Sequence, residues 1–190
     1  MIMRPRVDLA DARSWPPMKK KSLSNYQQKK LFHNQNGVFQ DEAARHRMDS
    51  THDRRGVAVA DLDGDGRLDL FVANANGSPY LYRNALASEA HWIAFQLTGT
   101  KSNRDAVGAQ LRATAGGRTQ LRFVDGGNGF AGQSSRRVHF GLGGAGAVDR
   151  LEVRWPSGLR QSFGPLAADR LYRLVEGERA ARPLRLGAGS

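Results

Sequence analysis

Short runs of alternating apolar and polar residues recur along this chain and predict β-strands, because successive side chains of a strand point to opposite faces of its sheet. In the C-terminal half these runs lie at 92–97, 109–114, 120–124, 137–140, 149–155 and 160–163. Gly116-Gly117, between the second run and the third, is typical of a tight hairpin turn. Six or seven short strands at this spacing predict a β-sandwich. Residues 171–175 could add an edge strand.

The N-terminal half carries shorter strand patterns that are interrupted by turns. Strands are predicted at 31–34 and 38–41, within a hairpin over 56–75, and at 80–84. An Asn-Gly turn joins the first two, and a polar connection with room for a single helical turn at 42–46 precedes the hairpin. A hairpin, a crossing connection and three more short strands are typical of propeller blades.

The composition agrees with a turn-rich all-β protein. The 190 residues include 22 Gly and no Cys, and helical periodicity is hard to find. The chain is long enough for one or two domains with a buried core. Without Cys it has no disulfide, no thiolate metal site and no Cys nucleophile. We therefore expect an all-β fold with partial propeller-like blades followed by a β-sandwich-like domain.

Four segments are expected along the chain. They are a flexible basic leader (1–24), a propeller blade fragment (25–88), a β domain (89–165), and an edge strand with a flexible tail (166–190). The leader carries charges and prolines and lacks the apolar core of a signal peptide. No apolar run approaches the roughly 20 residues of a membrane span. As written, the chain would be cytoplasmic or a truncated form of a longer protein.

The formal net charge of +11 raises the hypothesis of a polyanion partner, since clustered Lys and Arg displace counterions from nucleic acids and similar polymers. Much of the excess lies near the two ends, around 19–21 and 170–185. Aromatic residues are not interleaved with these charges, as base stacking would require. This distribution favours a solvated basic surface over a specific nucleic-acid site.

The most informative chemistry lies in the loop of the second hairpin, where four carboxylates occupy odd-numbered positions between 61 and 69. Their mutual repulsion in a partly desolvated turn would raise their pKa values or unfold the turn, and a divalent cation removes it. Calcium accepts several oxygen ligands in flexible geometry, whereas magnesium requires a stricter octahedron. The predicted Ca²⁺ ligands are side-chain oxygens of Asp61, Asp63, Asp65 and Asp69 and the backbone carbonyl oxygen of Arg67.

This loop has two alternative interpretations. An EF-hand shares the opening pattern, but it needs a Glu at position twelve, which here is Val72, and a helix on each side. The flanks at 56–60 and 70–74 are instead rich in strand formers. Gly64 and Gly66 supply the positive φ angles that wrap a backbone around an ion. An acidic turn without metal remains the plain alternative.

The loop with its flanks, residues 56–74, resembles an FG-GAP or VCBS-type repeat, the calcium-loop blade of integrin-like β-propellers. The following region resembles the ASPIC/UnbV domain that often ends such propeller chains. Five stretches carry the second resemblance, at 91–92, 99–109, 115–120, 139–143 and 153–158. Together the two resemblances cover about residues 30 to 165. The second is the more specific, because several unusual stretches recur in one order.

The resemblance implies an extracellular or periplasmic protein that acts in adhesion or binds proteins or glycans, with calcium in a structural role. The rival functions are the non-catalytic end of a polysaccharide-acting enzyme and a basic polyanion-binding protein. A propeller fragment leaves strand edges and an apolar face open, so we also expect self-association through the blade edge or docking against residues 91–163.

No catalytic or cofactor-binding residue is predicted. His91 and His139 lie beside aromatic residues without a nucleophile or carboxylate at motif spacing, which favours structural roles. The polar loop at 101–105 could bind a ligand or only stabilise its own turn. The Gly-rich loop at 126–135 lacks the Lys and the helix of a phosphate-binding loop, and it could face a ligand or simply cross between strands.

Overall fold

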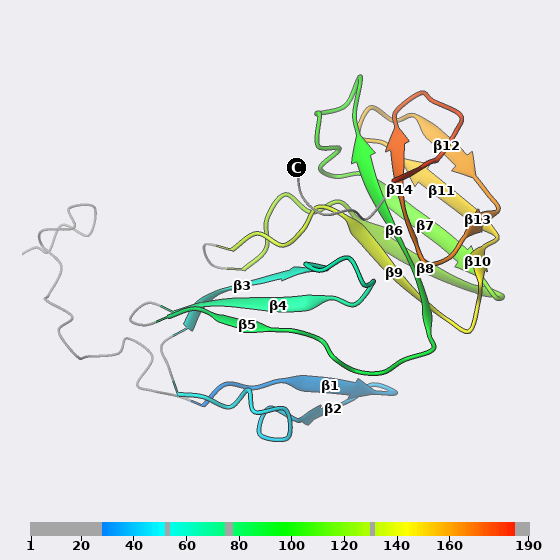
Figure 1. Cartoon of the computed structure of the whole chain (residues 1–190). Coiled ribbons are helices and arrows are strands. Elements are labelled where there is room, and N and C mark those ends of the chain that lie inside the picture. Colours follow the sequence, from blue (N-terminus) through cyan, green and yellow to red (C-terminus); the bar gives the residue numbers. More distant parts are fainter. Residues whose placement is uncertain (1–27, 52–53, 75–77, 130–131, 185–190) are drawn as a thin grey trace, which may run out of the picture. The chain divides into compact units, whose positions relative to one another are not determined.

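The structure, a computed structural model, describes residues 28–51, 54–74, 78–129 and 132–184 (Figure 1). The regular secondary structure within these ranges consists of β-strands alone, which confirms the all-β prediction. Within them, no helix has the length and apolarity that crossing a membrane requires. The predicted leader at 1–24, the turn residues 76–77 and the last residues of the predicted tail lie outside the described ranges.

The chain divides into two compact units, and the first consists of Met1–Arg54 with Asn74–Gly77. It contains the antiparallel hairpin of β1 (Phe32–Gln35) and β2 (Val38–Asp41). Asn36 and Gly37 both have positive φ, 52° and 92°, so the predicted Asn-Gly turn is confirmed. Residues 43–47 form hydrogen-bonded turns, and the single helical turn expected at 42–46 does not form a helix.

The second unit, Arg55–Ala73 with Ser78–Ser190, begins with a three-stranded sheet. β3 (Arg54–Ala60), β4 (Asp69–Asn74) and β5 (Tyr80–Tyr82) follow one another in that order across the sheet. The acidic loop joins β3 to β4, as the strand, metal loop, strand interpretation predicts. Three strands fall short of the four of a complete propeller blade, in agreement with the expected partial blade.

Two four-stranded sheets build the β-sandwich of the same unit. One has the order β12-β11-β7-β8 and the other the order β15-β14-β6-β9. Their strands are β6 (His91–Thr98), β7 (Gln110–Ala115), β8 (Arg118–Phe123), β9 (Val138–Gly143), β11 (Arg150–Arg154), β12 (Arg160–Phe163), β14 (Arg170–Val175) and β15 (Arg182–Leu184). A small pair, β10 (Ala147–Val148) with β13 (Leu166–Ala167), lies beside them.

One core fills the space between the two sheets. It takes Phe95 and Phe140 from one sheet and Leu111, Leu151 and Val153 from the other, all almost fully buried. The rings of Phe95 and Phe140 meet edge to face, with centroids 5.9 Å apart. Because side chains alternate along each strand, the residues between these core positions form two outer faces.

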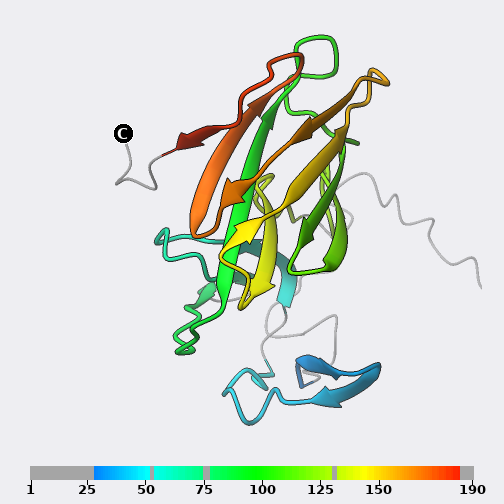
Figure 2. The same ribbon diagram turned by 90° about the vertical axis from the view of Figure 1, so that its right-hand side faces the viewer.

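Strand β14 corrects the sequence-based prediction for the end of the chain. The edge strand expected at 171–175 lies inside its sheet, where it pairs in parallel with β6 and antiparallel with β15. Figure 2 draws orange β14 beside green β6. Leu171, Tyr172 and Leu174 are buried, so this strand belongs to the sandwich core. β15 is the edge strand on that side of the sheet, in a region where a flexible tail was expected.

Candidate metal centre

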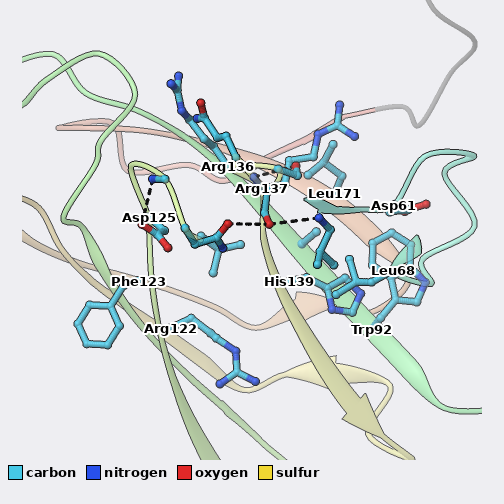
Figure 3. A pocket seen from close by; sticks show the side chains of 18 residues that line it. Asp61, Leu68, Trp92, Arg122, Phe123, Asp125, Arg136, Arg137, His139 and Leu171 are labelled. Atoms are coloured by element: carbon cyan, nitrogen blue, oxygen red, sulfur yellow. Dashed lines mark hydrogen bonds between the residues drawn. The ribbon is translucent and has the colours of Figure 1, made fainter. Parts of the chain in front are cut away.

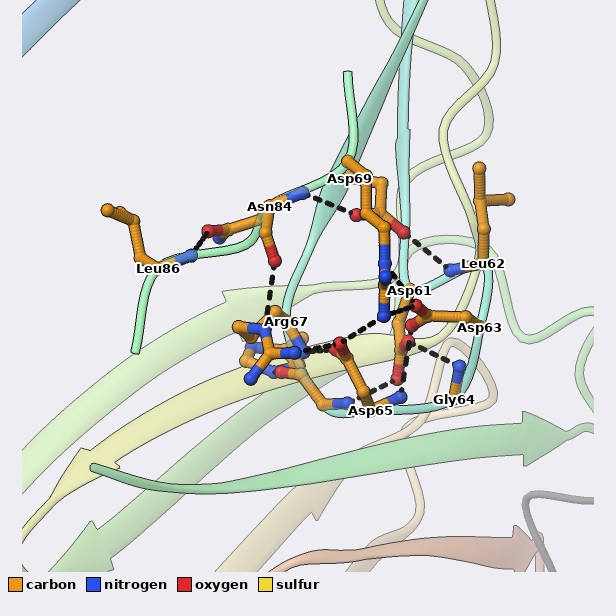
Figure 4. Close-up of polar contacts among 12 residues, drawn as sticks. Asp61, Leu62, Asp63, Gly64, Asp65, Arg67, Asp69, Asn84 and Leu86 are labelled. Carbon is orange, nitrogen blue, oxygen red and sulfur yellow. Dashed lines mark hydrogen bonds and ion pairs between the residues drawn. The ribbon is translucent and has the colours of Figure 1, made fainter. Parts of the chain in front are cut away.

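Short hydrogen bonds within the loop turn its carboxylates inward (Figure 4). Asp61 accepts from the backbone N–H groups of Gly64 and Gly66, at 2.8 and 3.0 Å. Asp65 accepts from the backbone N–H of Arg67 at 2.8 Å. Gly64 and Gly66 have positive φ angles of 76° and 85°, as expected for a backbone that wraps around a point.

Three of the predicted ligands converge. One carboxylate oxygen from each of Asp61, Asp63 and Asp65 lies within 4.8 Å of the others. Three carboxylates offer only hard oxygen donors, and the half-buried Asp61 and Asp65 are partly shielded from water. Such a set fits calcium, which is bound by carboxylate and carbonyl oxygens.

Asp69 lies outside that group of three and is bound differently. It is buried, with 3% of its surface exposed. Its Oδ2 accepts from the Leu62 backbone N–H at 3.1 Å and its Oδ1 from that of Asn84 at 2.8 Å. It therefore ties the first residues of the loop to the chain that follows β5, and a ligand role for it stays a prediction.

Two arginine side chains form ion pairs with carboxylates of the acidic loop, and the sequence pattern indicated neither pair. Arg67 pairs with Asp65 and also donates through Nε to the Asn84 carbonyl at 2.9 Å. Arg83 pairs with Asp63 at 2.7 Å. Desolvation raises the pKa of Asp63, but the hydrogen bond and charge of Arg83 outweigh it and lower the pKa. The prediction for Arg67 concerned only its carbonyl.

The loop packs against the outer face of the β6–β9 pair of the sandwich. His139 Nε2 donates to the Gly66 carbonyl at 2.9 Å, and the His139 and Trp92 rings stack 5.8 Å apart. A Cβ on Gly66 would lie 1.9 Å from the Trp92 indole, so only glycine fits there. Burial lowers the pKa of His139, which favours a neutral ring with its proton on Nε2. This structural role agrees with the expectation for His139.

A pocket of about 250 Å³ opens beside this contact (Figure 3). Asp61 and Leu68 from the acidic loop line it, together with Trp92, His139 and several arginines of the second unit. Part of the Gly-rich loop closes it, where Ser134 Oγ accepts from the Val59 backbone N–H at 3.2 Å. That loop therefore both lines a pocket and holds the blade sheet, whereas its residues 130–131 lie outside the described ranges.

Glu176 is a buried carboxylate that lies outside the acidic loop. Glu176 follows β14, is 3% exposed and accepts hydrogen bonds from the backbone N–H groups of Thr100, Lys101 and Ser102 at 2.7–2.8 Å. The hydroxyls of Ser102 and Ser157 donate to its other oxygen. Burial raises its pKa, but the hydrogen bonds outweigh burial and lower the pKa to about 2.

This carboxylate explains much of the polar loop at 101–105. The loop wraps around Glu176, and Asn103 closes its turn through two hydrogen bonds with the backbone of Val107. Asp105 pairs with Arg136. The turn-stabilising role for Asn103, one of the two expected for this loop, is confirmed.

Comparison with known families finds a match for each of two stretches of the chain. A family model described as "FG-GAP-like repeat" matches residues 22–72, and one described as "ASPIC and UnbV" matches residues 99–181. The first match contains β3 and the acidic loop, and the second contains most of the sandwich. The two resemblances seen in the sequence are thereby confirmed in the same order.

The chain is similar to three relatives, and each similarity extends over only part of the relative's length. Cartilage acidic protein 1 is 34% identical over 107 residues in Xenopus tropicalis, 50% in Mus musculus and 32% in Homo sapiens. Each match covers 54% of this chain and 16% of the relative. The chain thus corresponds to a small share of those proteins.

Proposed function

We propose that this chain, an FG-GAP-like repeat followed by an ASPIC and UnbV domain, is a non-catalytic interaction module whose repeat holds a structural calcium ion. The observation that carries the proposal is the convergence of carboxylate oxygens of Asp61, Asp63 and Asp65 within 4.8 Å, in a loop whose own backbone N–H groups donate to all three. Three like charges at this separation repel, and a divalent cation converts that repulsion into attraction.

The proposed ligands are the ones predicted from the sequence. Asp61, Asp63 and Asp65 supply side-chain oxygens, Arg67 supplies its backbone carbonyl, and Asp69 either binds through a free lone pair or holds the loop for the others. When bound, calcium neutralises the loop. Arg67 and Arg83 lie on the same carboxylates and compete with the ion for them.

The position of the loop supports a structural role for the ion. The Gly66 carbonyl accepts from His139, and Trp92 covers the glycine. Bound calcium would keep the loop rigid, so that the Gly66 carbonyl stays against His139 and the Gly66 backbone stays under Trp92. In this way calcium holds the blade sheet against the sandwich. The exposed Phe32, Val38 and Phe39 of the first unit are apolar surfaces that a further blade or a second copy would cover.

The setting and the partners are also part of the proposal. The resemblance to adhesion propellers and the relatives named for cartilage support an extracellular protein that binds a protein or a glycan. The rival role, as the non-catalytic end of a polysaccharide-acting enzyme, would be supported by turnover of a polysaccharide. Glycan binding without turnover supports the interaction module.

Calcium titration followed by tryptophan fluorescence tests the metal site. The indole of Trp92, on β6, packs against Gly66 of the loop, so calcium binding changes its emission, and magnesium at equal concentration does so much less. Asp63→Ala abolishes the change, and Trp92→Phe removes the signal while calcium binding persists by calorimetry. Saturable calcium binding that Asp63→Ala leaves unaltered would overturn the assignment.

A further inference from the structure

The two outer faces of the sandwich differ in what covers them. The face formed by β6 and β9 contacts the acidic loop through Trp92 and His139. The opposite face belongs to the sheet β12-β11-β7-β8. Its outward residues include Arg112 on β7, Arg150 and Arg154 on β11, and Arg160 on β12, all exposed. We call these four residues and the outward side chains between them the arginine face.

The strand register places two of these arginines directly opposite each other. Arg154 faces Arg160 on one side and Gln110 on the other. Like charges directly opposite in an antiparallel pair destabilise a sheet, whereas favourable cross-strand pairs contribute roughly 0.2–1 kcal/mol. The fold therefore retains an arrangement that its own stability does not favour.

Glu152, which lies directly opposite Arg112 across the β7–β11 pair, balances only part of this charge. Glu152 is the one carboxylate among the outward residues, and it pairs with Arg150 at 2.8 Å. Among the described residues, Arg112, Arg154 and Arg160 have no ion pair with a carboxylate. Three guanidinium groups thus remain available on one flat face.

The geometry points to a binding site for an acidic polysaccharide on the arginine face. A groove of about 490 Å³ runs between these arginines, and Gln110 and Ser162 contribute amide and hydroxyl groups to its lining. Guanidinium groups bind carboxylates and similar oxyanions through two parallel hydrogen bonds. Amides and hydroxyls bind the hydroxyl groups that a sugar chain presents between its charges.

The edge of the same face adds an apolar surface. Leu121 faces Arg112, and Phe123 faces Gln110, across the β7–β8 pair. Both side chains are substantially exposed, at 43% and 53%. A sugar ring has an apolar C–H face that packs on such side chains, and an aromatic ring offers a large flat area for it.

A polysaccharide fits this face better than a single-stranded nucleic acid. Nucleic acids stack successive bases on a series of aromatic side chains along a basic groove. Phe123 is the one exposed aromatic among the described outward residues of this sheet. This inference rests on the proposed role as an interaction module, and it names the class of ligand. It does not depend on calcium binding by the acidic loop.

The test measures binding of the full chain to heparin, with dextran as a neutral polymer and single-stranded DNA as a second polyanion. The site variant combines Arg112→Gln, Arg154→Gln and Arg160→Gln. The matched control combines Arg47→Gln, Arg104→Gln and Arg137→Gln, which are exposed, do not line the groove and remove the same charge. Both variants keep the basic residues at the chain ends.

The site variant is expected to bind heparin about tenfold or more weakly, and the slope of log affinity against log salt flattens by about one for each lost contact. The control loses much less. Equal losses in both variants, or binding that removal of residues 1–24 alone abolishes, would overturn the site. Tighter binding of the chain to DNA than to heparin, lost in the site variant, would reassign the face to nucleic acid.

Thermal unfolding separates a binding role from a structural one. Since Arg154 and Arg160 repel, their replacement is expected to keep or raise the unfolding temperature while binding falls. A site variant that unfolds at a lower temperature would mean that the arginines serve the fold. The calcium response of this variant is expected to stay unchanged, so failure of either proposal is recognised independently of the other.

Discussion

The acidic loop and the buried Glu176 show two different ways in which this protein stabilises carboxylates. In the loop after β3, three carboxylates converge and together accept hydrogen bonds from four backbone N–H groups of the same loop. At Glu176, five donors from two loops converge on a single carboxylate. The ratio of donors to charges therefore indicates which cluster needs a cation. Glu176 has five donors for one charge, whereas the loop has fewer for each carboxylate even with Arg67 and Arg83, and we propose that calcium supplies the remaining charge compensation.

Removal of the Glu176 carboxylate is expected to have the largest effect. Glu176→Ala leaves three backbone N–H groups and two hydroxyls without their acceptor, at a cost of about 3 kcal/mol or more. For a chain of this size that lowers the unfolding temperature by at least ~6 °C. The loss should be the same with calcium and with chelator, and a loss seen only with calcium would break the comparison.

Acid should weaken the protein through the same residue. The pKa of Glu176 is lowered from 4.5 to about 2 in the folded chain, so its contribution is fully present above pH 4.5 and is lost as pH falls toward 2. The slope of unfolding temperature against pH in that window should flatten in Glu176→Gln, which cannot ionise. An unaltered slope would assign the acid sensitivity to other carboxylates.

A smaller loss of stability is expected when the contact between the acidic loop and the sandwich is disturbed. Gly66→Ala requires the Trp92 indole to move and places alanine at a φ of +85°, for a cost of about 1–3 kcal/mol. Gly117→Ala is the matched control, since its φ is +75° and nothing lies within 4 Å of an added Cβ. Denaturant unfolding compares the two. Equal losses would mean that backbone strain, rather than the Trp92 contact, explains the effect.

The smallest predicted effect concerns the arginines on the loop. Arg67→Ala and Arg83→Ala each remove an exposed or half-exposed ion pair, which is worth about 0–1 kcal/mol. The calcium-dependent rise in unfolding temperature should persist, because only the carbonyl of Arg67 is a proposed ligand. Without a competing positive charge, calcium should bind about threefold more tightly. Weaker binding by calorimetry would show that these side chains assist the ion.

Local patterns in the sequence were enough to predict most strands and the acidic loop. The Asn36-Gly37 turn and the alternation in β6, β7 and β8 are read from neighbouring residues. The interior position of β14 was missed because its partner β6 lies about 80 positions earlier, and parallel pairing leaves no local signal. The predicted edge strand and tail at 166–190 also contain Glu176, and four of its five donors come from Thr100, Lys101 and Ser102, about 75 positions earlier.

The candidate site was predicted in part for the same reason. The spacing of Asp61, Asp63 and Asp65 is a local signal, and the structure brings these three together. Arg83 and His139 reach the loop from other strands or connections, so no motif could indicate them. The arginine face depends on strand register across β7, β11 and β12, which the alternation of single strands does not specify.

The most direct test of the account is the unfolding temperature of the chain after exhaustive metal removal, measured with and without saturating calcium. At a hundredfold excess over Kd, calcium adds about 2.7 kcal/mol, or ~5–11 °C for a chain of this size. Magnesium at equal concentration adds much less, and Asp63→Ala loses most of the rise. An unfolding curve that is the same in calcium and in chelator would contradict the central claim and leave an acidic turn without an ion.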